Sequence, residues 1–484
     1  ITWQQNHFYD AFRLRGHLYY DFDVDATMDS LEHPVRYKLV STDANEVLVW
    51  SNSTGEFDLP ADTGTWHVWH TPPPSYQVTN DPDTLVATLT PQAPIATGLD
   101  IGLAPATNDT ALGFWVTYQA MRCNTAQVVQ LRLANNGTAI ATGVVLSFEL
   151  LGDLTYSSVS PAPDSIVGPT FFWNLDSLHW FQEFVAQITV DVGAAGTTAG
   201  WHATMVAANL PDTLVAGFGP QGVSCSWDPN DKLVTPQGYG SAGAVPVDIP
   251  WLDYTVRFQN TGTDTAFNVS VLDTLDTDLD PLTMEVLDAS HPLTRIEVDT
   301  GRVALFQFQH ILLPDSGANE TASHGFVRFR IRPVAGSPDG TQITNSAGIV
   351  FDWNAPVITN TVLNTLVDCS LYQALITDQG SFLEASAGGA YQWFLNGDTV
   401  PGGTGATITD LHTGSYTVQV TSVYGCVSLS DPVEVITTGI TGAAVDGVRF
   451  FPNPAHNRLV IASSHGWTSG THLRILDASG RVLR

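Results

Sequence analysis

The sequence has few basic residues. Only 18 of its 484 residues are Lys or Arg, against 48 Asp or Glu, which gives a formal charge of −30. A field of this sign repels the phosphates of nucleic acids and of anionic membranes, so we expect no nucleic-acid binding. Charged residues make up only 14% of the chain and hydrophobic residues 43%, which is typical of folded domains and not of a disordered acidic tail.

Long apolar runs are also missing. No stretch of about 18 uninterrupted apolar residues is present, so the sequence predicts no transmembrane helix. The chain begins at Ile1 with neither Met nor a signal-like segment. We therefore expect that the true N-terminus was removed or lies upstream.

Cysteine is scarce, and the four residues of this type are widely spaced: Cys123, Cys225, Cys369 and Cys426. No CxxC pair occurs, which argues against a zinc site or a thioredoxin-type redox motif. An even number with wide spacing suits one or two disulfides in an oxidising compartment, and four buried free thiols are the alternative. The pairs we predict are Cys369–Cys426 and Cys123–Cys225.

Signatures of catalysis are absent from the sequence: it has no GxSxG, no HExxH and no Gly-rich phosphate loop. His67 and His70 are three residues apart on an expected strand, so they point to opposite faces and cannot share a metal. Five tryptophans favour sandwich cores over a sugar-stacking platform: Trp66, Trp69, Trp173, Trp180 and Trp201. The sequence predicts a protein that is not an enzyme.

Short alternating runs bounded by Gly, Pro, Asn and Asp recur along the whole chain. Examples are TWHVWHT, DYTVRFQNTGT and GSYTVQVTS. Alternation with a period of two is typical of half-buried strands. We predict an all-β protein made of tandem β-sandwich domains of the immunoglobulin-like type.

Two segments of the chain are similar to each other. VVQLRLANNGTAIATGVVLSFEL, around Asn135, resembles DYTVRFQNTGTDTAFNVSVLDTL, around Asn260, with a strand, an N-x-G-T turn and a second strand in each. Such self-similarity predicts two copies of one sandwich domain, about 125 residues apart.

Gly- and Pro-containing turns and linkers suggest where the domains end. A smaller domain that starts near Cys369 has Trp393 as its core candidate, and closing the Cys369–Cys426 loop would contribute on the order of 4 kcal/mol. The five expected domains are residues 1–104, 105–223, 224–367, 368–438 and 439–484.

The stretch DFDVDATMDSLE, residues 21–32, concentrates acids. Carboxylates this close repel one another unless a cation is present, and calcium prefers six to eight oxygen ligands. Ala26 stands where an EF-hand has Gly, and strands are expected on both sides, which argues against a sensor that opens helices. We predict a structural Ca²⁺ site, with a solvated acidic loop as the alternative; its ligands would be Asp21, Asp23, Asp25, the Thr27 carbonyl, Asp29 and Glu32.

A second acidic group lies in CSWDPNDK, where the two copies meet. Asp228, Asn230 and Asp231 could bind Ca²⁺ there and stiffen the junction. Turn formation by the Asp-Pro-Asn-Asp run is the alternative, and it is the favoured one.

Two resemblances follow from longer stretches. LRGHLYYDFDVDATMDSLE and STGEFDLPADTGTWHVWHTPPPSYQVT, within residues 12–104, resemble the prealbumin-like B-type repeat of bacterial surface adhesins. That resemblance implies a calcium-stiffened spacer in a stalk. From SWDPNDK to FDWNAPVITNTVLNTL the chain is similar to a repeat domain of secreted Bacteroidetes-type proteins, a family without an agreed activity.

The C-terminal segment carries a third resemblance. VRFFPNPAHNRLVIASS and LRILDASGRVLR resemble the type A C-terminal sorting domain of the type IX secretion system, with Pro452, Asn453 and Pro454 as the rigid turn. Such a domain implies export by the type IX machinery to the cell exterior or the outer-membrane surface, followed either by release or by attachment to lipopolysaccharide. These domains normally continue with another hairpin, so we expect a truncated copy.

Three functions are compatible with these observations. The first is a non-catalytic, adhesin-like stalk, stiffened by calcium and disulfides, whose partner would be a glycan or another copy of itself. The second is the accessory C-terminal region of a secreted hydrolase with its catalytic domain upstream. The third is a subunit of a self-assembling extracellular filament.

Overall fold

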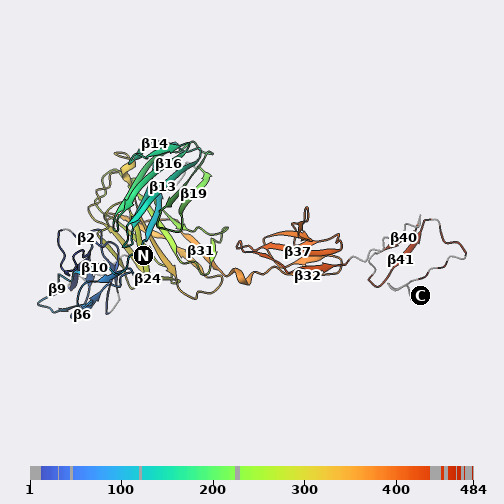
Figure 1. The fold of residues 1–484 in the computed structure, drawn as a ribbon, viewed down its shortest axis with the longest axis horizontal. Coiled ribbons are helices and arrows are strands. Elements are labelled where there is room, and N and C mark those ends of the chain that lie inside the picture. Colours follow the sequence, from blue (N-terminus) through green and yellow to red (C-terminus); the bar gives the residue numbers. More distant parts are fainter. Residues whose placement is uncertain are drawn as a thin grey trace. The chain divides into compact units, whose positions relative to one another are not determined.

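The computed structural model describes residues 12–30, 32–43, 47–118, 121, 123–223, 229–436, 448–451, 456–464, 466–469, 472, 474 and 482. Strands dominate this part of the chain, and its helical turns are two 3-10 segments, η2 (Thr321–Ser323) and η3 (Cys369–Leu371). Figure 1 shows the ribbon. The chain divides into a larger unit, Ile1–Gly238 with Ala242–Leu366, and a smaller unit, Tyr239–Ser241 with Val367–Arg484.

The larger unit begins with what we term the first module, residues 12–105. Its core contains Leu14, Leu18 and Ile101, which are fully buried. One of its sheets has six strands: β1 (Arg13–Tyr20), β2 (His33–Pro34), β5 (Glu56–Pro60), β7 (Tyr76–Val78), β9 (Ile95–Ala96) and β10 (Ile101–Pro105).

The second module, residues 112–222, is a sandwich of two sheets drawn mainly in green in Figure 1. The first sheet has the order β11-β12-β17-β14, with β11 (Leu112–Tyr118), β12 (Ala126–Asn135), β17 (Glu183–Asp191) and β14 (Thr155–Ser160). The second has the order β15-β16-β13-β18-β19, with β15 (Ser165–Val167), β16 (Thr170–Leu178), β13 (Ala141–Gly152), β18 (Thr198–Val206) and β19 (Leu214–Gly222). Alternation along each strand places one face in a shared core.

The third module, residues 231–366, repeats this design. One sheet has the order β20-β22-β27-β24, with β20 (Asp231–Thr235), β22 (Leu252–Gln259), β27 (His324–Pro333) and β24 (Leu279–Ala289). A small sheet is formed by β21 (Ala244–Pro246), β31 (Val362–Val367) and β28 (Gln342–Asn345).

The other large sheet of the third module continues into the first module. Its nine strands have the order β30-β29-β23-β26-β25-β4-β3-β6-β8. The third module supplies β30 (Val357–Ile358), β29 (Ala347–Phe351), β23 (Val269–Thr274), β26 (Val303–Phe308) and β25 (Arg295–Val298). The first module supplies β4 (Leu48–Trp50), β3 (Leu39–Thr42), β6 (Gly64–Trp69) and β8 (Leu85–Leu89). The two modules are therefore joined by backbone pairing as well as by the chain.

The second and third modules share their strand order and their turn chemistry. Asn135 donates to the carbonyls of Ala139 and Leu178 at 2.8 and 2.9 Å and accepts from the Gly137 N–H at 3.1 Å. The equivalent contacts of the third module have the same geometry, since Asn260 donates to Asp264 and Leu313 at 2.8 and 3.0 Å and accepts from Gly262 at 3.0 Å. The repeated N-x-G-T motif therefore corresponds, in each module, to a buried asparagine whose side chain hydrogen-bonds a turn to a neighbouring loop.

The smaller unit contains a compact β-sandwich with Trp393 at its core, fully buried as predicted. Its sheets contain β32 (Ile376–Asp378), β33 (Leu383–Ala385) and β36 (Thr407–Ile408) on one side and β35 (Asp398–Thr399), β34 (Ala390–Leu395), β37 (Gly414–Thr421), β38 (Val427–Leu429) and β39 (Val433–Val435) on the other. A two-stranded hairpin of β40 (Val448–Phe451) and β41 (Val460–Ser463) follows. In the part of the chain that the structure covers, no helix has the length and apolar character needed to cross a membrane.

Candidate functional site

The predicted calcium loop brings three carboxylates together. Asp21, Asp23 and Asp25 each offer an oxygen, and these oxygens all lie within 4.8 Å of one another. Asp21 is fully buried, whereas the other two are exposed. No Lys or Arg pairs with these three carboxylates among the described residues. The donor set is all oxygen, which is the chemistry that calcium prefers.

The backbone of the loop turns sharply without glycine. Val24 and Ala26 both have φ near 60°, the left-handed region that is rare for residues with a side chain and unfavourable for a β-branched one. Ala26 occupies the position where an EF-hand has Gly, so the structure makes the same turn with an alanine. Strained residues of this kind persist only where surrounding contacts hold them in place.

Two carboxylates provide those contacts. Asp21 accepts from the backbone N–H groups of Asp25 and Ala26 at 3.2 and 2.9 Å. Glu32 closes the loop, because it accepts from the N–H groups of Phe22 and Asp29 at 3.1 and 3.0 Å.

The two carboxylates respond differently to this setting. Burial is the largest influence on Asp21 and would raise its pKa, but the neighbouring Thr79 hydroxyl and the backbone hydrogen bonds together hold that pKa below its usual value. Burial and the neighbouring charges of Asp21 and Asp29 raise the pKa of Glu32. Burial, followed by the charges of Asp21 and Glu32, also raises the pKa of Tyr19. The loop therefore concentrates negative charge at a partly buried place.

The remaining predicted ligands lie on the same loop but outside this group of three. The Thr27 N–H donates to Asp25 at 2.7 Å, while Asp29 and Glu32 are joined by their own hydrogen bond. The structure therefore brings Asp21, Asp23 and Asp25 together and places Thr27, Asp29 and Glu32 around the rest of the turn.

Residues in and beside the loop form an aromatic joint with the second module. The rings of Tyr20 and Phe22 lie 6.1 and 5.1 Å from the ring of Trp180. His33, just after the loop, stacks on Phe181 with ring centroids 4.7 Å apart. Trp180 and Phe181 lie between β16 and β17 of the second module. The acidic loop is thus placed where the first and second modules meet.

The second predicted metal group is arranged differently. Asp231 is buried, and both of its carboxylate oxygens accept hydrogen bonds from Arg257. Asn230 accepts from the Gln259 N–H at 3.2 Å. Asp228 lies outside the described residues. Asp231 is the counter-ion of a buried guanidinium, and the calcium site at this position stays a prediction.

The next residue in that motif has a structural role. Lys232 and Asp273 form an ion pair in the core of the third module, both fully buried. The Lys232 ammonium also lies 4.7 Å from the centre of the Tyr254 ring, and Asn360 exchanges two 2.9 Å hydrogen bonds with the Lys232 backbone. Burial raises the pKa of Asp273, and the Lys232 charge opposes that rise.

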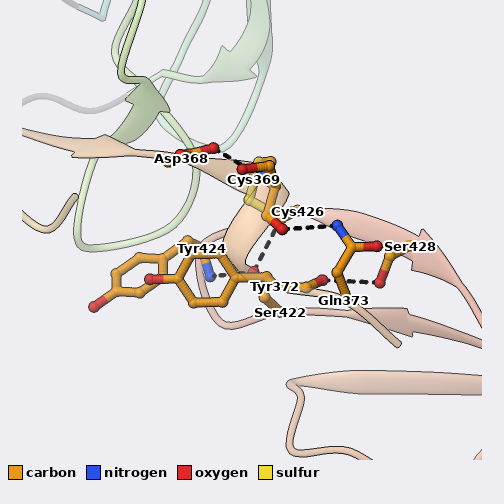
Figure 2. The surroundings of a disulfide bond; sticks show 9 residues. Asp368, Cys369, Tyr372, Gln373, Ser422, Tyr424, Cys426 and Ser428 are labelled. Carbon is orange, nitrogen blue, oxygen red and sulfur yellow. Dashed lines mark hydrogen bonds between the residues drawn. A yellow bond between two sulfur atoms is a disulfide. The ribbon is translucent and has the colours of Figure 1, made fainter. Parts of the chain in front are cut away.

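The disulfide Cys369–Cys426 is present, as predicted. Figure 2 shows its surroundings: the Cys426 N–H donates to the Ser422 hydroxyl at 3.1 Å, and the Ser428 hydroxyl donates to the Tyr372 carbonyl at 2.9 Å. Cys123 is disulfide-bonded too. Cys225, its predicted partner, and the sorting turn Pro452, Asn453 and Pro454 lie outside the described residues.

The two histidines lie in different environments, as expected for residues that point to opposite faces of a strand. His67 is half-exposed and contacts the Asp43 carboxylate at 2.9 Å. His70 is buried, with Nδ1 2.8 Å from the Leu39 carbonyl oxygen. Burial lowers the pKa of His70 to about 4.

A cleft that the sequence reasoning missed lies where the three modules of the larger unit meet. It has a volume of about 880 Å³. We term it the three-module cleft, and its charged lining residues are Arg36, Lys38, Arg132, Glu183, Asp253, Glu285, Arg328 and Arg330. The run FVRFRIR, which places Arg on one face of β27 at every second position, is the signal that could have indicated it.

One segment of the chain is similar to a known family. Residues 228–365 match a family described as "Domain of unknown function (DUF7619)". This is less than half of the chain, and the description assigns no activity. No curated protein matches the sequence.

Solved structures resemble the chain only weakly. The C-terminal domain of the Streptococcus pyogenes antigen I/II-family protein AspA is 11% identical, with 52% of this chain and 99% of that one covered and a TM-score of 0.21. The collagen adhesin of S. aureus is 10% identical, with 58% and 95% covered and a TM-score of 0.19. A DUF3823 family protein from Bacteroides ovatus is 12% identical, with 44% and 100% covered and a TM-score of 0.18. Likenesses at such low scores support no conclusion about function.

Proposed function

We propose that the chain is a non-catalytic structural protein of the cell exterior, in which three β modules form one rigid body braced by calcium. The observation that carries the proposal is the nine-stranded sheet shared by the first and third modules. Modules that share a sheet cannot rotate freely about a linker, because rotation would break the backbone pairing.

The shared sheet is reinforced by side chains. Trp50 pairs with Ile296 in the register of β4 and β25. Its indole is 2% exposed and lies in the core of the third module, where Nε1 donates to the Met284 carbonyl at 3.1 Å. A buried Trp contributes several kcal/mol through the area that it removes from water.

The second module is held by charged side chains. Arg132 on β12 pairs with Glu183 of its own module and with the buried Asp288 of the third. Arg257 of the third module donates to the Tyr118 carbonyl at 3.1 Å. Because Asp288 is buried, loss of Arg132 would leave an uncompensated charge at the joint.

Asp21, Asp23, Asp25, the Thr27 carbonyl, Asp29 and Glu32 are the groups that would hold calcium. The ion would supply the positive charge that offsets repulsion among these carboxylates. Tyr20 and His33 flank the loop and Phe22 lies within it, and all three pack against the second module, so fixing the loop fixes that joint. This makes the acidic loop a brace between two modules.

The location is proposed from the disulfides. Cys369–Cys426 is formed and Cys123 is bonded, and such bonds persist in oxidising compartments outside the cytoplasm. Export by the type IX machinery, suggested by the resemblance around Pro452 to Pro454, is part of the same proposal.

Thermal unfolding of the full chain with and without calcium tests the brace. After exhaustive chelation, Ca²⁺ at about 100 times its Kd should stabilise the larger unit by about 2.7 kcal/mol, a shift of roughly 5 °C. Small-angle scattering in the same samples should show that chelation leaves the larger unit compact but increases its flexibility.

The double variant Asp23→Asn, Asp25→Asn is the matched control. It removes two exposed carboxylates and should abolish the calcium-dependent shift while keeping the fold. An unchanged melt on chelation of the wild-type chain rejects the calcium brace. Independent movement of the first and third modules in scattering rejects the rigid body itself.

A further inference from the structure

We propose that the three-module cleft binds a short acidic saccharide, a sugar that carries one or a few carboxylate or sulfate groups. The cleft is formed by side chains from all three modules and has a volume of about 880 Å³, within the roughly 300–1,000 Å³ typical of ligand sites. This inference does not depend on calcium at the acidic loop.

The charge of the cleft is opposite to that of the whole protein. Five of its lining residues are Lys or Arg and three are Asp or Glu, whereas the chain as a whole has 18 basic against 48 acidic residues. Cations are therefore concentrated in one concave place. At physiological salt a bound ligand interacts mainly with charges within about 8 Å, so the local excess of cations decides its binding.

Two of these cations are available to a ligand. Arg36 is exposed and Lys38 is half-buried, both on the first module. Neither forms an ion pair in the described part of the chain. An arginine fork and a lysine ammonium are the groups that most often recognise carboxylates and sulfates.

Three other arginines are fixed in position but not fully satisfied. Arg132 is held by Glu183 and Asp288, and Arg328 by Asp253 at 3.0 Å. The Nε atoms of Arg132, Arg328 and Arg330 are buried without a hydrogen bond, although Arg330 Nε lies 3.4 Å from an Asp253 oxygen.

Because these Nε atoms are shielded from solvent, a ligand in the cleft would interact with the positive charge of the three guanidinium groups and not with these donors. Because other contacts already hold the guanidinium groups, a ligand would lose little free energy in ordering them.

Aromatic rings complete the lining. Tyr37, Tyr118 and Phe181 are half-buried at the cleft and offer apolar faces for the C–H groups of a sugar ring. Tyr37 and Phe181 have φ of 60° and 56°, strained conformations of the kind that gather at binding sites. Rings and fixed cations together match a sugar with acidic groups better than a bare inorganic anion.

The charge of the whole chain limits the length of the ligand. A formal charge of −30 repels a long polyanion at a distance, since its far end would extend from the cleft into the negative field. A short saccharide fits within the region where the cations prevail.

Calorimetric titration of the full chain tests the assignment. The probes are a uronic acid trisaccharide, a sulfated trisaccharide, a neutral trisaccharide and inorganic phosphate. At least one acidic trisaccharide should bind saturably at one site and weaken as salt is added, and the arm that binds identifies carboxylate or sulfate as the recognised group. The neutral trisaccharide and phosphate should bind at least tenfold more weakly.

Charge variants locate the site. Arg36→Glu with Lys38→Glu should weaken binding at least tenfold, and Glu285→Lys, at an exposed lining position, should strengthen it several-fold. Arg458→Glu makes the same kind of charge change at an exposed residue outside the lining and should alter binding less than twofold. Melting of each variant reports on its fold.

Four results would overturn the proposal. They are no saturable binding of either acidic trisaccharide, equal binding of the neutral one, equal binding of phosphate, and an Arg458→Glu loss as large as that of the double variant. A gain on Glu285→Lys supports the site even if the double variant unfolds.

Discussion

Phe148 and Asp273 occupy the same place in two related sandwiches. Each lies on the middle one of the five strands that its module supplies to its larger sheet, and the 125-residue shift that relates Asn135 to Asn260 also relates these two. Phe148 pairs with Ala203 on the next strand and Asp273 with Ala347, and both are fully buried.

The second module fills this position with a ring and the third with a carboxylate paired to Lys232. The same fold therefore accommodates either an aromatic ring or a carboxylate at this buried position, provided that the carboxylate is paired with a cation. Buried ion pairs are often no more stabilising than apolar residues of similar size, but losing one partner is costly.

The edges of the two sandwiches differ as well. In the third module β25 pairs with β4 of the first module, whereas the equivalent edge strand β15 pairs only with β16 among the described strands. Ile166 and Val167 on β15 are 47% and 66% exposed. The same edge is thus extended in one copy and exposed in the other, so the position of the first module is specific to the third.

The largest expected effect comes from breaking the ion pair. Asp273→Ala leaves the Lys232 ammonium in the core without a counter-charge and should destabilise the larger unit by about 3–5 kcal/mol. Urea unfolding of the full chain, followed by tryptophan fluorescence, measures this change.

The double variant Lys232→Met, Asp273→Leu imitates the apolar solution of the second module. It should be near neutral or stabilising. If it is as unstable as Asp273→Ala, the cost arises from packing and not from the unpaired charge.

The first module contains a third kind of buried side chain, a neutral histidine, beside the ring and the ion pair of the other two modules. The pKa of His70 is lowered to about 4, below its ordinary 6.5, so the unfolded chain takes up a proton first as the pH falls. Stability should be full above pH 6.5 and fall by about 3 kcal/mol between pH 6.5 and 4, with little further loss from this group below that.

Urea midpoints across this pH range measure the loss. His70→Asn should flatten the pH dependence, because it removes the buried group whose pKa is lowered. An unaltered slope in His70→Asn assigns the acid sensitivity to other groups.

The smallest expected effect concerns the buried asparagine turn that the second and third modules share. Asn135→Ala and Asn260→Ala each remove three hydrogen bonds that hold a buried turn against a neighbouring loop. Each should cost about 1–3 kcal/mol, and the two losses should be alike. Unfolding in urea compares them directly, and a negligible loss in one copy alone would show that the two turns are not equivalent.

Local patterns in the sequence were sufficient for much of this structure. Alternation predicts the strands, and the all-β fold is confirmed. The echo around Asn135 and Asn260 predicts repeated turn chemistry, and the spacing of Cys369 and Cys426 suits the bond that forms. In the acidic loop, closeness along the chain is enough to bring Asp21, Asp23 and Asp25 together.

Long-range partners could not be predicted in this way. Nothing in DPNDK distinguishes a metal ligand from a counter-ion, because Arg257, which binds Asp231, lies on another strand. Likewise, the alternation in β4 shows that it is a strand but not that its neighbour is β25, since any open edge offers the same backbone groups. The three-module cleft depends on how three modules dock, so no local pattern encodes it.

The shared sheet also has a consequence for how such a gene can change. Recombination exchanges segments between expected linkers, and a cut near residue 105 would transfer the first module as a separate piece. The remaining chain would carry an unpaired β25 and, in its core, the space that Trp50 had filled. The segment that can be inherited and exchanged intact is therefore the three modules together, larger than any repeat visible in the sequence.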